Sequence, residues 1–377
     1  MAANEAPDRV GLIDEAVTRL RVMLPRAWDV EPSSGGEIDA QRQGASTDGS
    51  IELRDQRGVS VTVAVQASRS FNPRDVASLS GGVLRVIRSM APYVPLLVVA
   101  PWISPRTQEM LAEQDINYLD LAGNALLKLE NPALYVRTTG ATRNPQPAPR
   151  GLARVRGPRA ARLIRLLLDV RPPYGVSEIA AATGLASGYV SRLLDTLDRE
   201  ALIERAHRGR VQDVDIPALL RRWAESYDVL GTNTASMFIA PSGAVEALSR
   251  LADLPAPESV AISGSFAAAR LAPVAAPALL VAYCEQVDAL ANELRLLPAD
   301  EGANVALLRP YDPVVWDRTV QDRAVRYVAP SQVAVDCLTG TGRMPAEGEA
   351  TISWMVANES VWRIASLDEL GATRRSA

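Results

Sequence analysis

The sequence predicts a multidomain α/β protein, and three observations support that fold class. Strand-like and helix-like apolar patterns alternate over residues 1–140 and again over residues 229–377. Residues 158–228 carry amphipathic helix patterns, a glycine turn and a short strand pair at the spacing of a winged helix-turn-helix. Residues 141–157 are rich in arginine and proline. We therefore expect two α/β domains, a linker after the first, and a winged helix-turn-helix between the linker and the second.

Residues 1–140 are expected to form one α/β domain. A helix pattern over residues 10–24 is followed by a polar loop over residues 31–50. The elements expected after it, in chain order, are strands over 50–54 and 59–67, a helix over 74–90, a strand over 94–100, a helix over 105–114, and a strand over 117–124 that enters a turn.

The order of these elements resembles the core of restriction-endonuclease-like folds. In active members of that superfamily, one acid precedes an acid-x-lysine motif on the next strand, and these residues hold magnesium. Asp48 or Glu52 could supply the first acid, but Ala64 and Gln66 stand where the second acid and the lysine belong. We therefore expect a scaffold without nuclease activity. The alternative is a nuclease with an unusual carboxylate set of Glu15, Asp48 and Glu52.

Residues 141–157 are expected to form a linker that leads into the winged unit. Proline makes such a segment extended and semi-rigid. Its arginines would let it follow a phosphate backbone.

The apolar spacing of the central domain predicts its helices. Leu163, Leu166 and Leu167 fall on one face of a helix over residues 160–170, and Pro172 prevents its continuation. Ser177 is a plausible N-cap for a second helix, which ends near Gly184. Ser187 is expected to cap a third helix over residues 188–200, and strands over 202–205 and 211–214 then form the wing. This arrangement is typical of units that read duplex DNA.

The third helix is the recognition-helix candidate, because the motif presents the N-terminal end of that helix to the major groove. Arginines of the linker and the wing are placed to contact phosphates. The candidate DNA-binding residues are Arg154, Arg156, Arg159, Ser177, Ser187, Gly188, Tyr189, Ser191, Arg192, Arg208 and Arg210.

The charge distribution supports this interpretation. The chain as a whole is mildly acidic, with a formal net charge of −4. Residues 137–210 nevertheless contain fourteen arginines and six acidic residues, a local net charge of +8. A basic block in an acidic chain is an electrostatic footprint for nucleic acid. The alternative is a winged helix that serves as a protein-interaction module.

The scarcity of reactive residues argues against an enzyme. The chain has one histidine, His207, and one lysine, Lys128, so it offers no zinc cluster, Ser-His-Asp arrangement or phosphate-binding lysine in a glycine loop. Cys284 and Cys337 lie in apolar contexts and are expected to be buried thiols. We expect no catalytic residue, metal or cofactor. The first residues lack a signal-peptide pattern, so a cytoplasmic location is expected.

The C-terminal segment, residues 229–377, is expected to form an α/β domain. A strand, a Gly-Ser turn and a helix over residues 259–270 precede an apolar strand over 278–284, an order that resembles a nucleotidyltransferase fold. The carboxylates that such a fold uses to hold metal ions are absent from the second strand. We therefore expect a degenerate, inactive relative of that fold.

The winged helix together with four short motifs resembles the actinobacterial regulators grouped with AbiEi-type antitoxins. The motifs are SGSFAAAR at 263–270, ANV at 303–305, YVAPSQ at 327–332 and VD at 335–336. The resemblance implies a winged helix that binds promoter DNA and a C-terminal domain that acts on a partner. This chain differs in carrying the winged helix centrally.

These observations predict a sequence-specific, non-enzymatic regulator of transcription that binds double-stranded DNA. A homodimer on a partly palindromic site is expected. A protein partner or a small-molecule effector remains open, as do the alternatives of a nuclease and of an antitoxin or DNA-repair adaptor.

Overall fold

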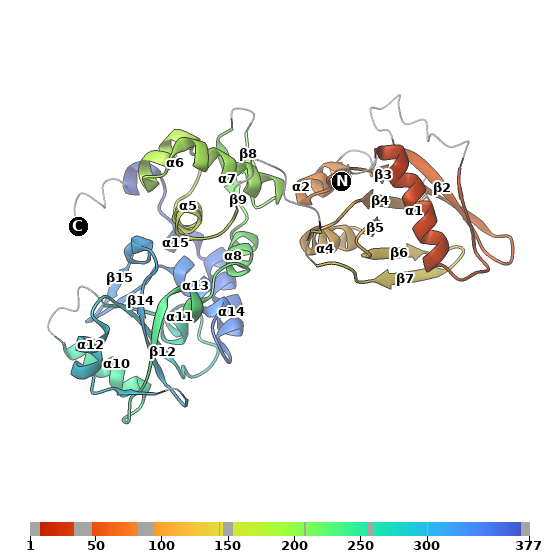
Figure 1. The fold of residues 1–377 in the computed structure, drawn as a ribbon. Helices are drawn as coiled ribbons and strands as arrows, with labels where there is room; N and C mark the ends of the chain where they lie inside the picture. Colours follow the sequence, from red (N-terminus) through yellow and green to blue (C-terminus); the bar gives the residue numbers. More distant parts are fainter. Residues whose placement is uncertain are drawn as a thin grey trace, which may run out of the picture. The chain divides into compact units, whose positions relative to one another are not determined.

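The structure, a computed structural model, describes residues 8–33, 47–81, 84, 94–142, 144–145, 154–206, 209–254, 260–299 and 301–370. Contacts between residues divide the chain into two compact units, Met1–Arg150 and Gly151–Ala377 (Figure 1). The division falls inside the segment that the sequence predicts to be a linker.

The first unit is built on a mixed sheet whose strands follow one another in chain order. The two pairings among the central strands β3, β4 and β5 are parallel, and the outer pairings are antiparallel. The strands are β1 (Asp29–Pro32), β2 (Gly49–Arg54), β3 (Ser60–Ala67), β4 (Leu96–Ala100), β5 (Asn117–Asp120), β6 (Ala125–Leu129) and β7 (Leu134–Thr138).

Helices cover both faces of this sheet, because successive side chains of a strand point to opposite faces. Val63 and Val65 of β3 belong to a core shared with Leu12 and Leu20 of α1 (Arg9–Met23). Ala64 belongs instead to the core formed with α2 (Pro73–Gly81) and α4 (Pro105–Glu113). The result is an α/β layered unit with α1 on one side and α2 and α4 on the other.

Most elements expected in this unit are present, with two differences. Glu31 lies in strand β1 and not in the loop, and β6 and β7 were not expected. The expected helix over 74–90 is confirmed as far as Gly81; apart from residue 84, its remainder lies outside the described residues.

The second unit begins with the predicted winged helix-turn-helix (Figure 1). Its hairpin pairs antiparallel, with a register irregularity between Glu204 and Arg205. The elements are α5 (Pro158–Asp169), α6 (Val176–Thr183), α7 (Ser187–Arg199), β8 (Ile203–Arg205), β9 (Val211–Val214) and α8 (Ile216–Ala224).

The rest of this unit is a second mixed sheet with helices packed on it. Its strand order is β13-β10-β14-β12-β11-β16-β15, with β11 parallel to β16 and β12 parallel to β14. The strands are β10 (Thr234–Ile239), β11 (Val260–Ser263), β12 (Leu280–Cys284), β13 (Leu297–Pro298), β14 (Val305–Arg309), β15 (Val320–Asp322) and β16 (Val325–Tyr327). The helices are α9 (Val229–Thr232), α10 (Ala244–Asp253), α11 (Gly264–Leu271), α12 (Val287–Glu293), the 3-10 helix η2 (Pro313–Trp316), α13 (Pro330–Leu338), α14 (Met344–Ala357) and α15 (Glu359–Trp362).

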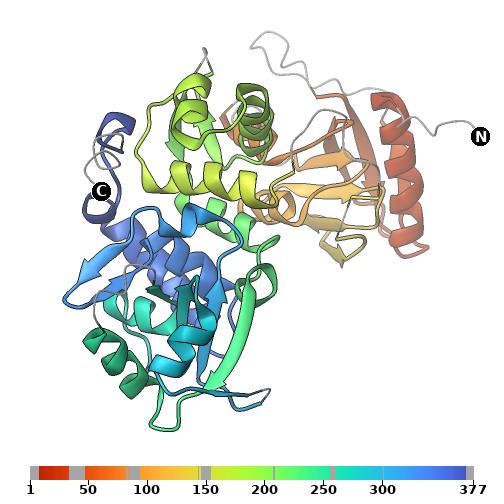
Figure 2. The same cartoon turned by 60° about the vertical axis from the view of Figure 1, so that its left-hand side comes forward.

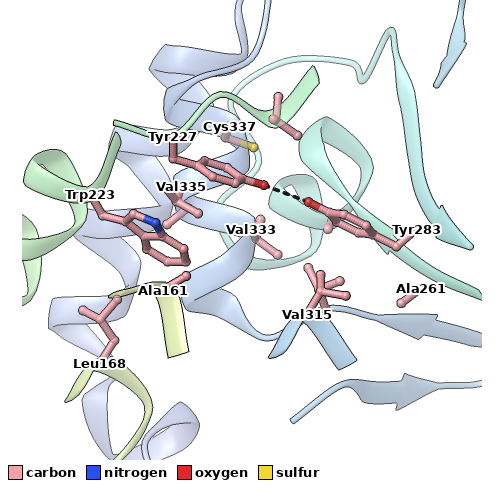
Figure 3. Packing of buried hydrophobic residues seen from close by; sticks show 14 of the residues in the cluster. Ala161, Leu168, Trp223, Tyr227, Ala261, Tyr283, Val315, Val333, Val335 and Cys337 are labelled. Carbon is pink, nitrogen blue, oxygen red and sulfur yellow. Dashed lines mark hydrogen bonds between the residues drawn. The ribbon is translucent and has the colours of Figure 1, made fainter. Parts of the chain in front are cut away.

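The winged elements and the second sheet share one hydrophobic core. In Figures 1 and 2, the blue helices α13 and α14 pack beside the green α8 that leaves the wing. Tyr227, just after α8, reaches Tyr283 of β12 with 3.0 Å between the two hydroxyl oxygens (Figure 3). Both segments therefore lie in one compact unit, and a division at residues 228/229 stays a prediction.

None of the helices among the described residues combines the length and the apolar character that crossing a bilayer requires.

Candidate nucleic-acid interface

Helix α5 anchors the winged unit. It begins at Pro158, where the missing N–H of proline costs nothing, and its apolar face is buried. Val170 caps its end, and Pro172 and Pro173 follow, as the sequence predicts. Val155, at the end of the expected linker, is buried in the same core and accepts a hydrogen bond from Ser226 Oγ at 2.6 Å. The residues just before α5 are therefore held against the unit.

The turn between α6 and α7 uses a left-handed glycine. Gly184 has φ +68° and ends α6, a conformation that a side chain disfavours. The predicted N-caps are wrong by one or two residues. Gly175 precedes α6, and its N–H donates to Glu178 at 2.5 Å, so Ser177 is an exposed residue inside that helix. Ala186 precedes α7, so Ser187 is the first helical residue and caps nothing.

Helix α7 presents one buried face and one accessible end. Val190, Leu193, Leu194 and Leu197 are fully buried and hold the helix on the core. The accessible residues include those predicted to contact DNA. Ser187, Gly188 and Arg192 are exposed, and Tyr189 and Ser191 are half-buried.

Three arginines surround a hollow beside this end of α7. Arg154, Arg156 and Arg159 are exposed and line a cavity of about 690 Å³ together with Gly184, Leu185 and Tyr189, among others. Among the described residues, these three arginines form no ion pair. Burial raises the pKa of the Tyr189 hydroxyl, and the charge of nearby Arg159 opposes that shift. We call Arg154, Arg156 and Arg159 the arginine arm.

The wing is tied to the helices by its own arginines. Arg210 donates to Pro173 O at 3.1 Å and pairs with Glu178 at 3.1 Å. Arg205 pairs with Asp195 of α7 at 2.5 Å. Arg210, directly before β9, therefore ties the end of the wing turn to the start of α6, while Arg208 lies outside the described residues.

The carboxylates considered for a nuclease do not gather into one site. Asp48 accepts from Arg9 at 2.8 Å and from Gln66 Nε2 at 2.5 Å. Glu15 pairs with Arg19, and Glu52 pairs with Arg54. Within the described ranges, no group of three or more histidine, cysteine, aspartate or glutamate side chains could hold a metal ion. Lys128 pairs with Asp115 near the surface.

The serine side chains at the Gly-Ser turn of the second sheet also donate hydrogen bonds within the protein. Ser263 donates to the buried carboxylate of Asp336 at 2.5 Å, and Ser265 donates to Glu347 at 2.5 Å. Strand β12, which follows, is buried along its whole length. Burial raises the pKa of the Cys284 thiol to about 12 and raises that of Cys337 further, so both behave as buried thiols.

A group of charged residues beneath the interface was not foreseen. Arg165 is 1% exposed and pairs with Asp169, while Arg162 pairs with Asp312, all at 2.9 Å. Arg165 also donates to Gln332 Oε1 at 3.0 Å. We call Arg162, Arg165, Asp169 and Asp312 the α5 ion-pair cluster. Only the spacing of Arg165 and Asp169 on one helix face is visible in the sequence; the other partners lie about 150 residues away.

Two family models of known proteins match parts of the second unit. The family model described as the IclR helix-turn-helix domain matches residues 158–207. The model described as "Transcriptional regulator, AbiEi antitoxin, Type IV TA system" matches residues 213–351. No curated protein and no solved structure matches the chain. The two matches confirm the predicted resemblance for the second unit and support a DNA-binding regulator, and they leave the first unit unassigned. The chain resembles winged helix-turn-helix transcriptional regulators of the AbiEi type.

Proposed function

We propose that the chain binds specific sequences of double-stranded DNA and regulates transcription, with α7 in the major groove. The observation that carries the proposal is the accessible end of α7 lying beside three exposed arginines that form no ion pair among the described residues. A recognition helix needs both an accessible end and cations nearby, since base edges supply specificity and phosphates supply most of the affinity.

The proposed contacts divide into two classes. Tyr189, Ser191 and Arg192 face base edges, and an arginine suits the two acceptors of guanine. Residues proposed to contact the sugar-phosphate backbone are the arginine arm, Ser177, Ser187, Gly188, Arg208 and Arg210. The exposure of Ser177, Ser187 and Gly188 on neighbouring helices supports this division.

This mode of binding favours a dimer, because one winged unit reads only a short half-site. We propose a homodimer on a partly palindromic site. We keep the first unit as an inactive scaffold of the restriction-endonuclease-like kind, supported by its mixed sheet and by carboxylates that lie in separate arginine pairs. The second sheet is proposed to derive from a nucleotidyltransferase-like fold whose Gly-Ser turn has become structural.

A second candidate function rests on the AbiEi match, whose printed description names an antitoxin. In that case the C-terminal segment would act on a protein partner, and DNA binding would control the expression of this chain and of that partner. Co-purification with the product of a neighbouring gene would support this function, and the DNA-binding proposal stands without it.

Selection of bound DNA tests the proposal. Purified full-length chain is incubated with a pool of genomic fragments, with and without magnesium, and the bound fragments are sequenced. We expect a few enriched sequences and fragments of unchanged length. Enrichment of no sequence would overturn the regulator, and magnesium-dependent cleavage would favour the nuclease.

A further inference from the structure

A second cavity lies directly behind the helix-turn-helix. It has a volume of about 410 Å³, within the range of small-molecule sites. One wall comes from α5 and from residues 181–184 at the end of α6, and the other comes from residues 312–318 around η2 and from Leu370. The cavity therefore joins the segment before the recognition helix to the C-terminal part of the same unit.

The walls of this cavity are fixed before any ligand arrives. The α5 ion-pair cluster lines it, and three members, Arg165, Asp169 and Asp312, are almost fully buried. Arg165 also donates to the main-chain oxygens of Val314 and Asp317 at 3.2 and 2.9 Å. These bonds lie where the two walls touch beside the cavity, and they hold the α5 wall and the η2 wall at a set separation, which is the preorganisation that a binding site needs.

The charges of the lining are mixed and balanced. Arg162, Arg165 and Arg318 face Asp169, Asp312 and Asp317, a net charge of zero. Two of the arginines are neutralised inside the α5 ion-pair cluster. A balanced lining disfavours a multiply charged anion and suits a molecule that carries one charge of each sign.

Arg318 is the anchor for the negative end. Its guanidinium donates to the main-chain oxygens of Asp169 at 2.9 Å and Trp362 at 2.6 Å, and it forms no ion pair with a carboxylate among the described residues. Burial lowers the pKa of this guanidinium, and the nearby carboxylate of Asp169 opposes that shift. A guanidinium has five N–H donors, so three remain for a carboxylate.

We propose that this cavity binds a small zwitterion of the amino-acid type. Its carboxylate meets Arg318, its ammonium meets the carboxylate of Asp317, and its side chain lies against Leu166, Val170 and Leu370. Because residues 181–184 form one wall, occupancy would bear on the position of α7, and this regulatory consequence rests on the proposed function.

Ligand binding is tested on the protein alone, so that its failure is distinct from a failure to bind DNA. The full chain is screened by thermal unfolding and titration calorimetry against single amino acids, against the matching carboxylic acids without the amine, and against the amines without the carboxylate. We expect at least one apolar amino acid to raise the melting temperature and neither of its truncated analogues to do so. No stabilisation by any amino acid, or equal stabilisation by an analogue, would overturn the proposal.

Variants locate the ligand. Arg318→Gln should weaken binding at least tenfold, whereas Arg323→Gln, an exposed arginine with a similarly positive φ, should leave it unchanged. Should Arg318→Gln fail to fold, Ala181→Phe serves instead, because it adds bulk at an exposed position of the lining. Unchanged binding in Ala181→Phe would place the ligand elsewhere and contradict the assignment. The DNA affinity is then measured with and without the ligand that binds.

Discussion

The arginines of the second unit fall into two groups that the sequence does not distinguish. Those of the arginine arm and Arg192 are exposed and form no ion pair among the described residues. Arg165 and Arg363 are 1% and 7% exposed, and their guanidinium groups donate hydrogen bonds to other groups of the protein. A count of local positive charge therefore overstates the surface that is available to DNA. The predictions below separate the two groups.

The largest effect is expected at Arg165. Its replacement by alanine leaves the carboxylate of Asp169 buried and removes three other hydrogen bonds, so the free energy of unfolding should fall by about 3–5 kcal/mol. Urea unfolding measures this loss. Arg199→Ala, an exposed substitution on α7, is the matched control and should change stability by less than about 0.5 kcal/mol. Equal losses of stability in the two variants would contradict the division into buried and exposed arginines.

The next prediction concerns Asp336, a buried carboxyl that shares the partner Gln332 with Arg165, and the pH dependence of its contribution to stability. Burial raises the pKa of its carboxyl above 3.8, and donors on Ser263, Tyr227 and Gln332 oppose that shift. A folded-state pKa above the unfolded value means that the stabilising contribution is fully present below the unfolded pKa and is lost as pH rises through the folded pKa.

Asp336→Asn removes this titration. The variant loses the hydrogen bonds of the carboxyl group and should be destabilised by about 1–3 kcal/mol, with the deficit relative to wild type shrinking as pH rises from the ordinary carboxyl pKa of 3.8 towards neutrality. Urea unfolding at several pH values checks the trend. A deficit that is constant or grows with pH would mean that the carboxyl is not protonated more readily in the folded protein.

The smallest effect is expected in the arginine arm. Arg156→Ala removes one proposed phosphate contact, so DNA affinity should fall by a similar factor for every sequence, and the slope of log affinity against log salt should fall by about 1. Fluorescence anisotropy over a salt series measures both. A loss confined to one sequence would assign Arg156 to base contact instead.

The comparison also shows how far sequence reasoning reaches. The helices of the winged unit were predictable because Leu163, Leu193 and Leu197 repeat at the helical period and prolines mark the ends. Strand β6 was missed because its alternation is brief, with the charged Lys128 between two buried leucines. The predicted caps failed because the residues that precede the two helices, Gly175 and Ala186, have no side chain that accepts a hydrogen bond from the first turn, so serine was a misleading signal.

Part of the site depends on contacts that no local pattern encodes. Arg162 and Arg192 look alike in the sequence, yet the first meets Asp312 across 150 positions and the second is exposed. The cavity behind the helix-turn-helix likewise takes its walls from α5 and from residues 312–318. The motif itself was predictable, since it is a local arrangement of helices and a turn.

The most direct test of the central claim measures the affinity of wild type, Arg192→Ala and Arg199→Ala for one enriched duplex and for a shuffled duplex of equal composition, at a single salt concentration. Both variants remove one positive charge from α7, but only Arg192 lies at the end proposed to read bases. We expect Arg192→Ala to lose about 1–3 kcal/mol on the enriched duplex and little on the shuffled one, while Arg199→Ala keeps the wild-type preference. Equal losses by the two variants on both duplexes would contradict sequence reading by α7.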